Sequence, residues 1–319
     1  MKLGLPAGLV VAYAVAWAVA FAATPAARWL ALRTGALDRP NERKLHHHPI
    51  PTWGGLAIAL GLLVGAAAGG FFVHLPTRAA AGIFGGAFFV GLVGFVDDRY
   101  DLPANAKLAL QVLATVPLLV GGVAITHLSH PFGPGMIALP GWLAGFLTIL
   151  WVVGVTNAIN LIDGLDGLAA GVSAIACVAL SLIALAWGQL AVALLCAAMA
   201  GAALGFLPWN WHPARIFMGD TGAYLLGYLI GAATVIGAFK MAAAIAIFVP
   251  ILVLAVPLLD TALSPLRRWA QGRPASVADR DHLHHRLIAL GLSEPRVVWL
   301  TYAVSALCAA IAIWISRTR

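Results

Sequence analysis

Three short segments of the chain carry acidic and amide side chains at a density that suggests metal or phosphate chemistry. The first, Asp97-Asp98-Arg99-Tyr100-Asp101, directly follows an apolar run that ends at Val96. Two adjacent carboxylates at a membrane boundary repel one another unless a cation lies close. The expected companion is a divalent ion or a proton, and Lys107 could bind an anion there. The alternative is a solvated loop start.

The second segment runs from Asn157 to Gly167. An amide or carboxylate recurs every third residue at the end of an apolar span: Asn157, Asn160, Asp163 and Asp166. On a continuous helix each step of three turns the face by about 60°, so we expect Gly164 and Gly167 to bend the backbone instead. Hard oxygen ligands at this density suit Mg²⁺ or Ca²⁺. Alternatively, Asp163 or Asp166 caps the following helix.

The third segment, Phe217-Met218-Gly219-Asp220-Thr221-Gly222, places an acid between glycines at the start of another apolar helix. Asp220 is either an N-cap or a metal ligand beside glycines that let a bulky ligand approach the backbone. A further acidic site on the same face favours the metal ligand.

Two basic segments complete the chemistry-bearing residues. They are Arg43-Lys44-Leu45-His46-His47-His48 and Arg280-Asp281-His282-Leu283-His284-His285-Arg286. Histidine clusters suggest zinc, but the many carboxylates and the lack of neighbouring cysteine favour anion binding. Carboxylates for Mg²⁺ and basic groups for phosphate are what phosphoryl transfer from a nucleotide requires. The absence of GxxxxGK[ST] excludes a P-loop ATPase.

The elements that position these segments must be membrane helices. Hydrophobic residues make up 62% of the 319 positions, charged residues only 10%, and the mean hydropathy is +0.94, whereas soluble domains carry about 25% charge. The sequence therefore predicts an all-α polytopic membrane protein. The three cysteines lie in apolar runs and are expected to be core residues.

About ten spans are expected, each near the ~20 residues that cross a bilayer. They are about 4–24, 53–73, 79–96, 107–126, 140–156, 167–187, 189–207, 221–239, 241–263 and 297–316. Only Trp187, Gly188 and Gln189 mark the division of 167–207 into two. We expect a single transmembrane domain over 1–319.

The basic residues predict the orientation. Apart from the tails, only Arg78 and Lys240 fall in loops after even-numbered spans, so the odd loops are expected in the cytoplasm and both termini outside. The expected cytoplasmic loops are about 25–52, 97–106, 157–166, 208–220 and 264–296. All twelve acids fall in or beside these loops, which predicts an active site on the cytoplasmic face.

Two other functional classes are disfavoured. The net charge of +7 is scattered through loops, so nucleic-acid binding is not expected. A cation-coupled transporter would place its acids near the midplane, often in two related halves, whereas here they gather at one face.

The five segments, in this order on ten apolar spans, resemble the polyprenyl-phosphate N-acetylhexosamine-1-phosphate transferases of the glycosyltransferase 4 or MraY-like superfamily. Residues 38–46, with Pro51 and Gly54-Gly55, are similar to the family's first cytoplasmic loop. Asp97-Asp98 is similar to its DD motif, 157–167 to NxxNxxDGxDG, and 217–222 to FxGDxG. The resemblance covers essentially the whole chain.

Details of the basic loops resemble the WecA and TagO branch of that family. The pentapeptide-transferring branch carries an HHH triplet, whereas this chain has His282-Leu283-His284-His285. The resemblance implies transfer of N-acetylglucosamine 1-phosphate from UDP-GlcNAc to polyprenyl (undecaprenyl) phosphate, with release of UMP. The product would be the lipid-linked sugar diphosphate that starts a cell-envelope glycan. A pentapeptide donor and another UDP-N-acetylhexosamine are the alternatives.

Residue by residue, the resemblance implies Mg²⁺, or Mn²⁺ in its place, with Asp220 as the principal ligand and Asn160 as a second candidate. Asp97 would be the base for the lipid phosphate, with Asp98 close by, and Lys107 would lie near the diphosphate. The implied substrate-binding residues are Lys44, Asn157, Asp163, Asp166, Arg280, His282, His284 and His285. The implied partners are the two substrates and the bilayer of the cell membrane, and a homodimer is left open.

Overall fold

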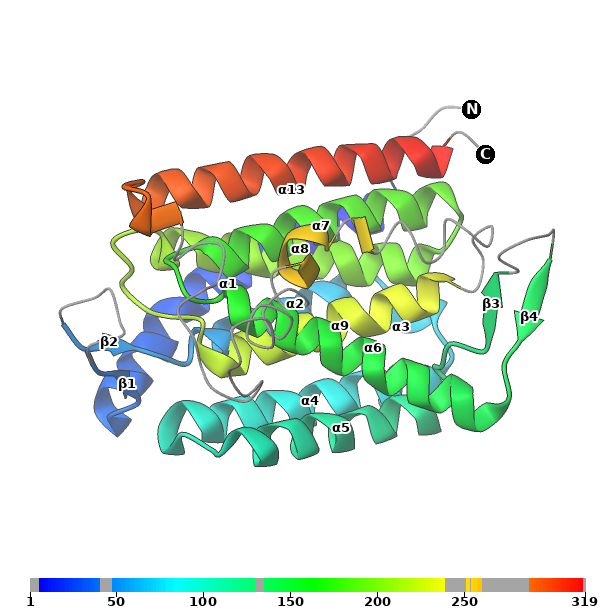
Figure 1. Ribbon diagram of the computed structural model, residues 1–319, viewed down its shortest axis with the longest axis horizontal. Coiled ribbons are helices and arrows are strands. Elements are labelled where there is room, and N and C mark those ends of the chain that lie inside the picture. The colour runs from blue at the N-terminus through cyan, green and yellow to red at the C-terminus, as the bar shows by residue number, and fades with distance from the viewer. Residues whose placement is uncertain are drawn as a thin grey trace.

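The computed structural model describes residues 6–40, 48–129, 135–238, 251–252, 254–259 and 287–317. Within these ranges the chain is mostly helical (Figure 1). The helices are α1 (Ala7–Thr34), α2 (Gly54–Ala68), α3 (Phe71–His74), α4 (Thr77–Tyr100), α5 (Ala104–Val120), α6 (Gly141–Ile162), α7 (Leu168–Ala186), α8 (Leu190–Asn210), α9 (Gly219–Ala238) and α13 (Glu294–Arg317).

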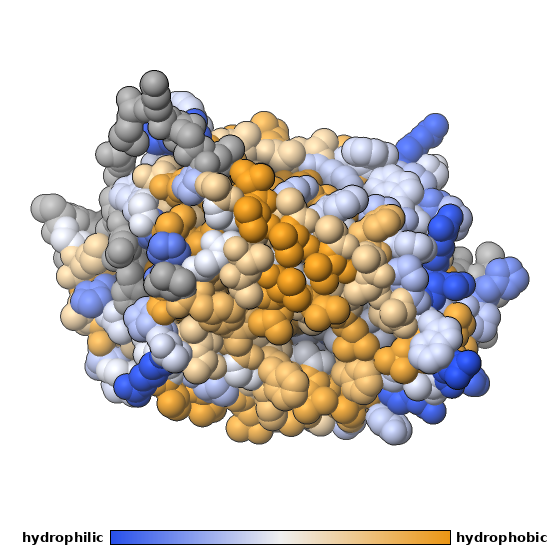
Figure 2. Space-filling view, turned by 180° about the vertical axis from the view of Figure 1, so that it is seen from behind, coloured by the Kyte–Doolittle hydropathy of each residue, from blue (hydrophilic) through white to orange (hydrophobic). Residues whose placement is uncertain are grey.

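Six of these helices are long and apolar enough to cross a membrane, namely α1, α4, α6, α7, α8 and α13. Two more apolar helices, α2 and α5, are shorter. Figure 2 shows an apolar band across the middle of one face, with hydrophilic residues gathered toward its two ends. The prediction of a multi-pass membrane protein is confirmed.

Every expected span except 241–263 overlaps one of these helices. The span at 241–263 lies mostly outside the described residues, so the count of ten stays a prediction. The division of 167–207 is confirmed, because Gly188 adopts a left-handed φ of 68° between α7 and α8. The backbone N–H of Gln189 closes this turn on the Ala184 carbonyl at 2.8 Å.

Several helices continue beyond the apolar runs that define the expected spans. Helix α1 extends past Pro25 to Thr34. Helix α4 continues to Tyr100, so Asp97 and Asp98 lie on its last turn and not in a loop over 97–106. Likewise α6 ends at Ile162 and carries the two asparagines of the second segment. Hydropathy marks where the apolar face ends, whereas the helical hydrogen bonds continue through polar residues.

Two short antiparallel sheets depart from the all-α expectation. Strand β1 (Leu37–Asp38) pairs with β2 (Ile50–Pro51), and β3 (His127–Ser129) pairs with β4 (Met136–Ala138). The two sheets lie at opposite ends of the helices (Figure 1). The described start of α1 and the end of α13 share the end that holds β3 and β4. Which side of the membrane this end faces stays a prediction.

Small residues let the helices approach closely. Helix α1 packs against α2 and α8. A side chain on Gly201 or Gly205 of α8 would collide with the α1 carbonyls of Tyr13 and Trp17, respectively. Helix α9 packs against α2, α4 and α6, which is the close packing expected of membrane helices rich in small residues. Because α9 carries Asp220, this packing brings the third acidic segment to the first two.

Candidate active site

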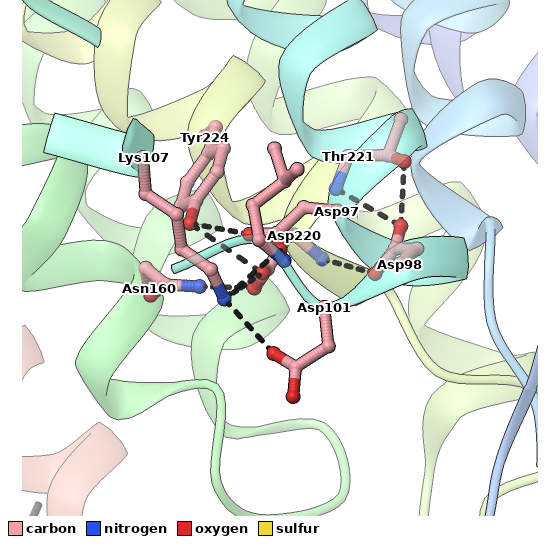
Figure 3. Close-up of polar contacts among 9 residues, drawn as sticks. Asp97, Asp98, Asp101, Lys107, Asn160, Asp220, Thr221 and Tyr224 are labelled. Carbon is pink, nitrogen blue, oxygen red and sulfur yellow. Dashed lines mark hydrogen bonds and ion pairs between the residues drawn. The ribbon is translucent and has the colours of Figure 1, made fainter. Parts of the chain in front are cut away.

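The last turns of α4 and α6 meet the first turns of α5 and α9 at the β1–β2 end of the molecule. Figure 3 shows the side chains that converge there. They are Asp97 and Asp98 from α4, Lys107 from α5, Asn160 from α6, and Asp220, Thr221 and Tyr224 from α9. Segments separated by more than a hundred positions in sequence therefore form one polar cluster.

Asp97 is the most enclosed acid of the cluster, with a side chain that is 0% exposed. Its Oδ1 accepts the Leu102 backbone N–H at 2.8 Å and lies 2.9 Å from Lys107 Nζ. Its Oδ2 accepts the Tyr224 hydroxyl at 3.0 Å. Lys107 is therefore the cation companion at this acid. Both carboxylate oxygens are occupied by protein donors.

Asp98 caps helix α9. Its Oδ1 accepts the Asp220 backbone N–H at 2.7 Å, and its Oδ2 accepts the Thr221 backbone N–H at 3.2 Å and the Thr221 hydroxyl at 2.6 Å. Unpaired N–H groups and the positive end of the helix dipole make a helix start favourable for a carboxylate. The alternative of Asp220 as the N-cap is therefore wrong, since a residue of another helix fills that role.

Gly219 makes this cap possible. Its φ of 71° is in the left-handed region that favours glycine. A Cβ at Gly219 would also lie 2.6 Å from both carboxylate oxygens of Asp98. On α4, a Cβ at Gly94 would lie 2.5 Å from the Asp220 carbonyl oxygen. Glycine at these two positions lets α4 approach the start of α9.

Asp220 is the accessible acid of the cluster, with a side chain that is 26% exposed. Its Oδ1 accepts Asn160 Nδ2 at 2.6 Å. Its Oδ2 lies 3.4 Å from the Tyr224 hydroxyl and 3.8 Å from Lys107 Nζ, whose side chain is 25% exposed. Lys107 also pairs with Asp101 at 3.4 Å. The accessible side of the cluster thus offers the Asp220 carboxylate, the Asn160 amide and the Lys107 ammonium group, with the exposed Asp101 beside Lys107.

The polar contacts continue one helical turn away from this surface. Asn157 Nδ2 donates to Gln111 Oε1 at 2.6 Å and to the Val153 carbonyl at 2.8 Å. Gln111 is 2% exposed and follows Lys107 by four residues on α5. Asn157 precedes Asn160 by three residues on α6. The same two helix faces therefore carry both layers of polar groups.

Asp163 lies just beyond α6, where the backbone leaves the helix as the glycines predicted. The side chain is half-buried. Burial raises the pKa of Asp163 well above its usual value, and the carboxylates of Asp220, Asp98 and Asp166 raise it further. The negative charge of the same cluster therefore acts on Asp163.

Asp166 lies in a second group of side chains. Its Oδ2 is 3.0 Å from His212 Nδ1 and accepts the Ala214 N–H at 3.0 Å, and His212 Nδ1 is 3.6 Å from Glu294 Oε2. The three ligand atoms of Asp166, His212 and Glu294 lie within 4.8 Å of one another. Helix α7 has Gly167 as its N-cap and no side-chain cap bond, so capping of α7 by Asp163 or Asp166 is wrong.

The start of α2 and the third segment, 217–222, meet through backbone hydrogen bonds. The N–H groups of Gly54 and Gly55 donate to the carbonyls of Phe217 and Met218 at 3.0 and 2.9 Å, and the Phe217 N–H donates to the Pro51 carbonyl at 2.8 Å. The start of α2 and the residues before α9 are thereby joined. Lys44, which was predicted to bind the nucleotide-sugar, lies outside the described residues.

The structure brings together most of the predicted site residues that it describes. Asp97, Asp98, Lys107, Asn160 and Asp220 share one cluster, with Asn157 one turn away. Asp166 lies with His212. The predicted residues of the last large loop, Arg280, His282, His284 and His285, lie outside the described residues.

Four polar residues of these clusters were missed by the sequence reasoning. Gln111 and Tyr224 each follow a predicted site residue, Lys107 and Asp220, by four positions. That helical spacing was the available signal. His212 and Glu294 carry no such local signal, because their partner Asp166 comes from a distant loop.

Comparisons with known proteins agree with this arrangement. The family model described as glycosyl transferase family 4 matches residues 80–238, which contain the three acidic and amide segments. The chain is 40% identical to a Bacillus subtilis protein named probable undecaprenyl-phosphate N-acetylglucosaminyl 1-phosphate transferase, over 93% of this chain and 82% of that protein. It is 36% identical to the decaprenyl-phosphate N-acetylglucosaminephosphotransferase of Mycobacterium tuberculosis, over 88% and 76% of the two chains.

A third relative is the undecaprenyl-phosphate alpha-N-acetylglucosaminyl 1-phosphate transferase of Salmonella typhi, at 29% identity over 90% of this chain and 78% of that protein. These matches span nearly the whole chain, as the resemblance of its motifs predicted. The chain belongs to the polyprenyl-phosphate N-acetylhexosamine-1-phosphate transferases, glycosyl transferase family 4.

Proposed function

We propose that this protein transfers N-acetylglucosamine 1-phosphate from UDP-GlcNAc to a polyprenyl phosphate and releases UMP. The relatives named above carry this activity in their names. The observation that carries the proposal is the partly exposed cluster of Asp220, Asn160 and Lys107. It lies at one end of an apolar helix bundle. A lipid phosphate can reach such a site from the bilayer, and a nucleotide can reach it from water.

In the direct route that we propose, the transfer is one displacement at phosphorus. An oxygen of the lipid phosphate attacks the phosphorus that bears the sugar, a new P–O–P bond forms, and the bond to the phosphate of UMP breaks. Negative charge gathers on the leaving UMP. The protein's part in such a transfer is mostly positioning and electrostatic stabilisation.

The donor set at Asp220 fits Mg²⁺, because a carboxylate and an amide oxygen are the hard ligands this ion takes while it keeps several waters. Asp220 would hold the ion, with Asn160 as a second ligand once its amide oxygen replaces the nitrogen that now donates to Asp220. When bound, the ion neutralises charge on the diphosphate. Mn²⁺ would take the same ligands. The group at Asp166 includes an imidazole, which is less typical of Mg²⁺.

The other polar groups have proposed roles around these two phosphates. Lys107 Nζ, shared by three carboxylates, would turn toward the diphosphate. To act as a base, Asp97 would have to exchange Lys107 or Tyr224 for the lipid phosphate, because both of its oxygens are occupied. Asp163 and Asp166 would contact the nucleotide-sugar. The basic residues proposed to bind the phosphates and the nucleotide are Lys44, Arg280, His282, His284 and His285.

Purified protein with undecaprenyl phosphate and Mg²⁺ should release UMP from UDP-GlcNAc and form a lipid-linked sugar diphosphate. UDP-N-acetylmuramoyl-pentapeptide should give no product, and Asp220→Asn is the matched inactive control. Release of UMP with the pentapeptide donor alone would move the protein to the other branch of the family. Comparable rates with UDP-GalNAc would widen the donor range without changing the reaction.

A further inference from the structure

Gln111 is a buried polar residue that the proposed reaction does not yet use. It lies on α5 one turn from Lys107 and is 2% exposed. Polar side chains inside membrane helices are costly and usually functional. A leucine or methionine would fill the same space without that cost, so the presence of an amide requires a reason.

The amide of Gln111 is only half used. Its Oε1 accepts Asn157 Nδ2 at 2.6 Å, whereas its Nε2 is buried without a hydrogen-bond partner among the described residues. An unpaired buried donor costs about 1–3 kcal/mol. This energetic cost is present while Gln111 Oε1 accepts the hydrogen bond from Asn157.

The Val153 carbonyl determines which way both amides face. A carbonyl can only accept, so the Asn157 atom that lies 2.8 Å from it must be the nitrogen. That nitrogen also faces Gln111, which must then present its oxygen. Both N–H bonds of Asn157 are consequently used, and its only remaining polar atom is the acceptor Oδ1.

Asn157 Oδ1 is the free acceptor in this part of the structure. It has no hydrogen-bond partner among the described residues. Because it is also not among their buried unpaired atoms, it is accessible. It lies on α6 within one turn of Asn160, whose amide contacts Asp220. An acceptor oxygen without a hydrogen bond repels phosphate oxygens. Asn157 Oδ1 would therefore bind an electropositive group, such as a cation or an N–H or O–H donor.

We propose that Gln111 is a positioning residue that locks the Asn157 amide with Oδ1 directed at an electropositive group of the reactants. That group is either the divalent cation with its waters or an N–H or O–H of the sugar nucleotide. The inference rests on the proposed transferase function. Gln111 acts through Asn157 and contacts no substrate itself.

The test compares Gln111→Met, which removes the acceptor, with Gln111→Glu, which keeps one. Gln189→Met is the matched control. Gln189 is the other buried glutamine of the described residues, 8% exposed, and it donates to the Gly237 carbonyl far from the cluster. For each protein we would measure the thermal midpoint, the affinity for Mn²⁺ alone by electron paramagnetic resonance, and kcat and KM for UDP-GlcNAc.

Gln111→Met should keep the wild-type thermal midpoint, because its lost hydrogen bond is offset by removal of an unpaired buried donor. It should weaken Mn²⁺ binding or raise KM for UDP-GlcNAc by about tenfold, the lower end of the loss expected when a residue that orients a ligand is removed. A change in Mn²⁺ affinity would identify the cation as the partner, and a change in KM alone the sugar nucleotide. Gln189→Met should keep the wild-type Mn²⁺ affinity and KM. Gln111→Glu keeps an acceptor, so its Mn²⁺ affinity and KM should lie closer to wild type than those of Gln111→Met, even where the buried carboxyl group lowers its thermal midpoint.

A double-mutant cycle with Asn157→Leu isolates the orienting effect. Leucine has no Oδ1 to orient, so Gln111→Met should have little further effect on Mn²⁺ affinity or KM in that background. Unchanged Mn²⁺ affinity and KM in Gln111→Met would overturn the proposal. Equal losses of Mn²⁺ affinity or equal rises of KM in Gln111→Met and Gln111→Glu, in proportion to a lowered thermal midpoint, would also overturn it. Failure of the wild-type protein to release UMP would instead count against the transferase function, and the Mn²⁺ titration would still test Gln111.

Discussion

The carboxylate of Asp98 accepts the backbone N–H of Asp220 at 2.7 Å, so one acid of the cluster holds the helix that presents another. Two further hydrogen bonds from Thr221 complete the cap. Of the adjacent pair on α4, Asp97 contacts Lys107 and Tyr224, whereas Asp98 contacts only the start of α9 among these groups. The two neighbouring aspartates therefore make separate sets of contacts in the cluster.

Asp98→Asn should lower both stability and activity. One of the two oxygens becomes an NH₂ group that faces backbone donors, and loss of a helix cap costs about 0.5–2 kcal/mol. Thr221→Val is the graded control, because it removes only the 2.6 Å hydroxyl bond and leaves the backbone bonds. Thermal unfolding in detergent with UMP release measures both effects. An Asp98→Asn protein with wild-type stability and no activity would assign Asp98 a direct catalytic role.

Lys107→Met should destabilise the protein, since it leaves the fully enclosed carboxylate of Asp97 without its cation. Breaking a buried pair from one side costs up to about 3–5 kcal/mol, and the two other donors to Asp97 should keep the loss below that. The double variant Lys107→Met with Asp97→Asn should recover much of the thermal midpoint but no activity. A double variant less stable than Lys107→Met would contradict the pairing.

Asp163→Asn should stabilise the substrate-free protein, increasingly so as pH rises. Because burial and neighbouring acids raise the pKa of Asp163, the folded protein holds a proton that the unfolded chain releases near its usual pKa of about 3.9. Wild-type stability therefore falls as pH rises through the raised pKa, whereas asparagine does not titrate. Thermal midpoints between pH 4 and 8 in chelator would measure this.

The control for Asp163 is Asp101→Asn, at a side chain that is 99% exposed. The loss of stability with rising pH that Asp163 causes should persist in this variant. A constant difference between Asp163→Asn and wild type across the pH range would show that Asp163 does not titrate with folding.

Metal removal should abolish turnover, and Mg²⁺ or Mn²⁺ should restore it. Asp220→Asn should lose at least about a hundredfold in kcat, because a charged oxygen ligand disappears from a site that holds a diphosphate. Its thermal midpoint should stay close to wild type, since the Asp98 cap uses the Asp220 backbone and not its side chain. Full activity of Asp220→Asn, or of chelated wild type, would exclude a metal at this residue.

The orientation can be tested with single cysteines after Cys177, Cys196 and Cys308 are replaced. Cysteines at Asn41 or Arg273 should be protected from an impermeant thiol reagent in intact cells, and one at Ser129 should be labelled. Ser129 lies in β3, at the end opposite the β1–β2 sheet. Labelling at Arg273 from outside would reverse the predicted sidedness of the active site.

The sequence by itself determined the membrane class, the division of 167–207 into two helices and the motifs of the site. These features are local, because a run of apolar residues must form a helix in lipid whatever its neighbours are. The apolar pattern could not predict helix ends, as α4 and α6 show, since helical hydrogen bonds pass through Asp97 and Asn160. The short β1–β2 and β3–β4 pairs were also missed, because two or three residues carry too little pattern.

Only the tertiary structure decided how the polar groups divide their contacts. Asp97 and Asp98 are neighbours of the same type, yet Asp97 contacts Lys107 and Tyr224 whereas Asp98 caps the start of α9, because adjacent residues on a helix face about 100° apart. The partners of Gln111, Asp166 and Asp98 lie 46, 46 and 122 positions away. Such pairs depend on how helices distant in the sequence pack. At the contact of α4 with α9, the glycines that permit this packing, Gly94 and Gly219, have no side chains to signal it.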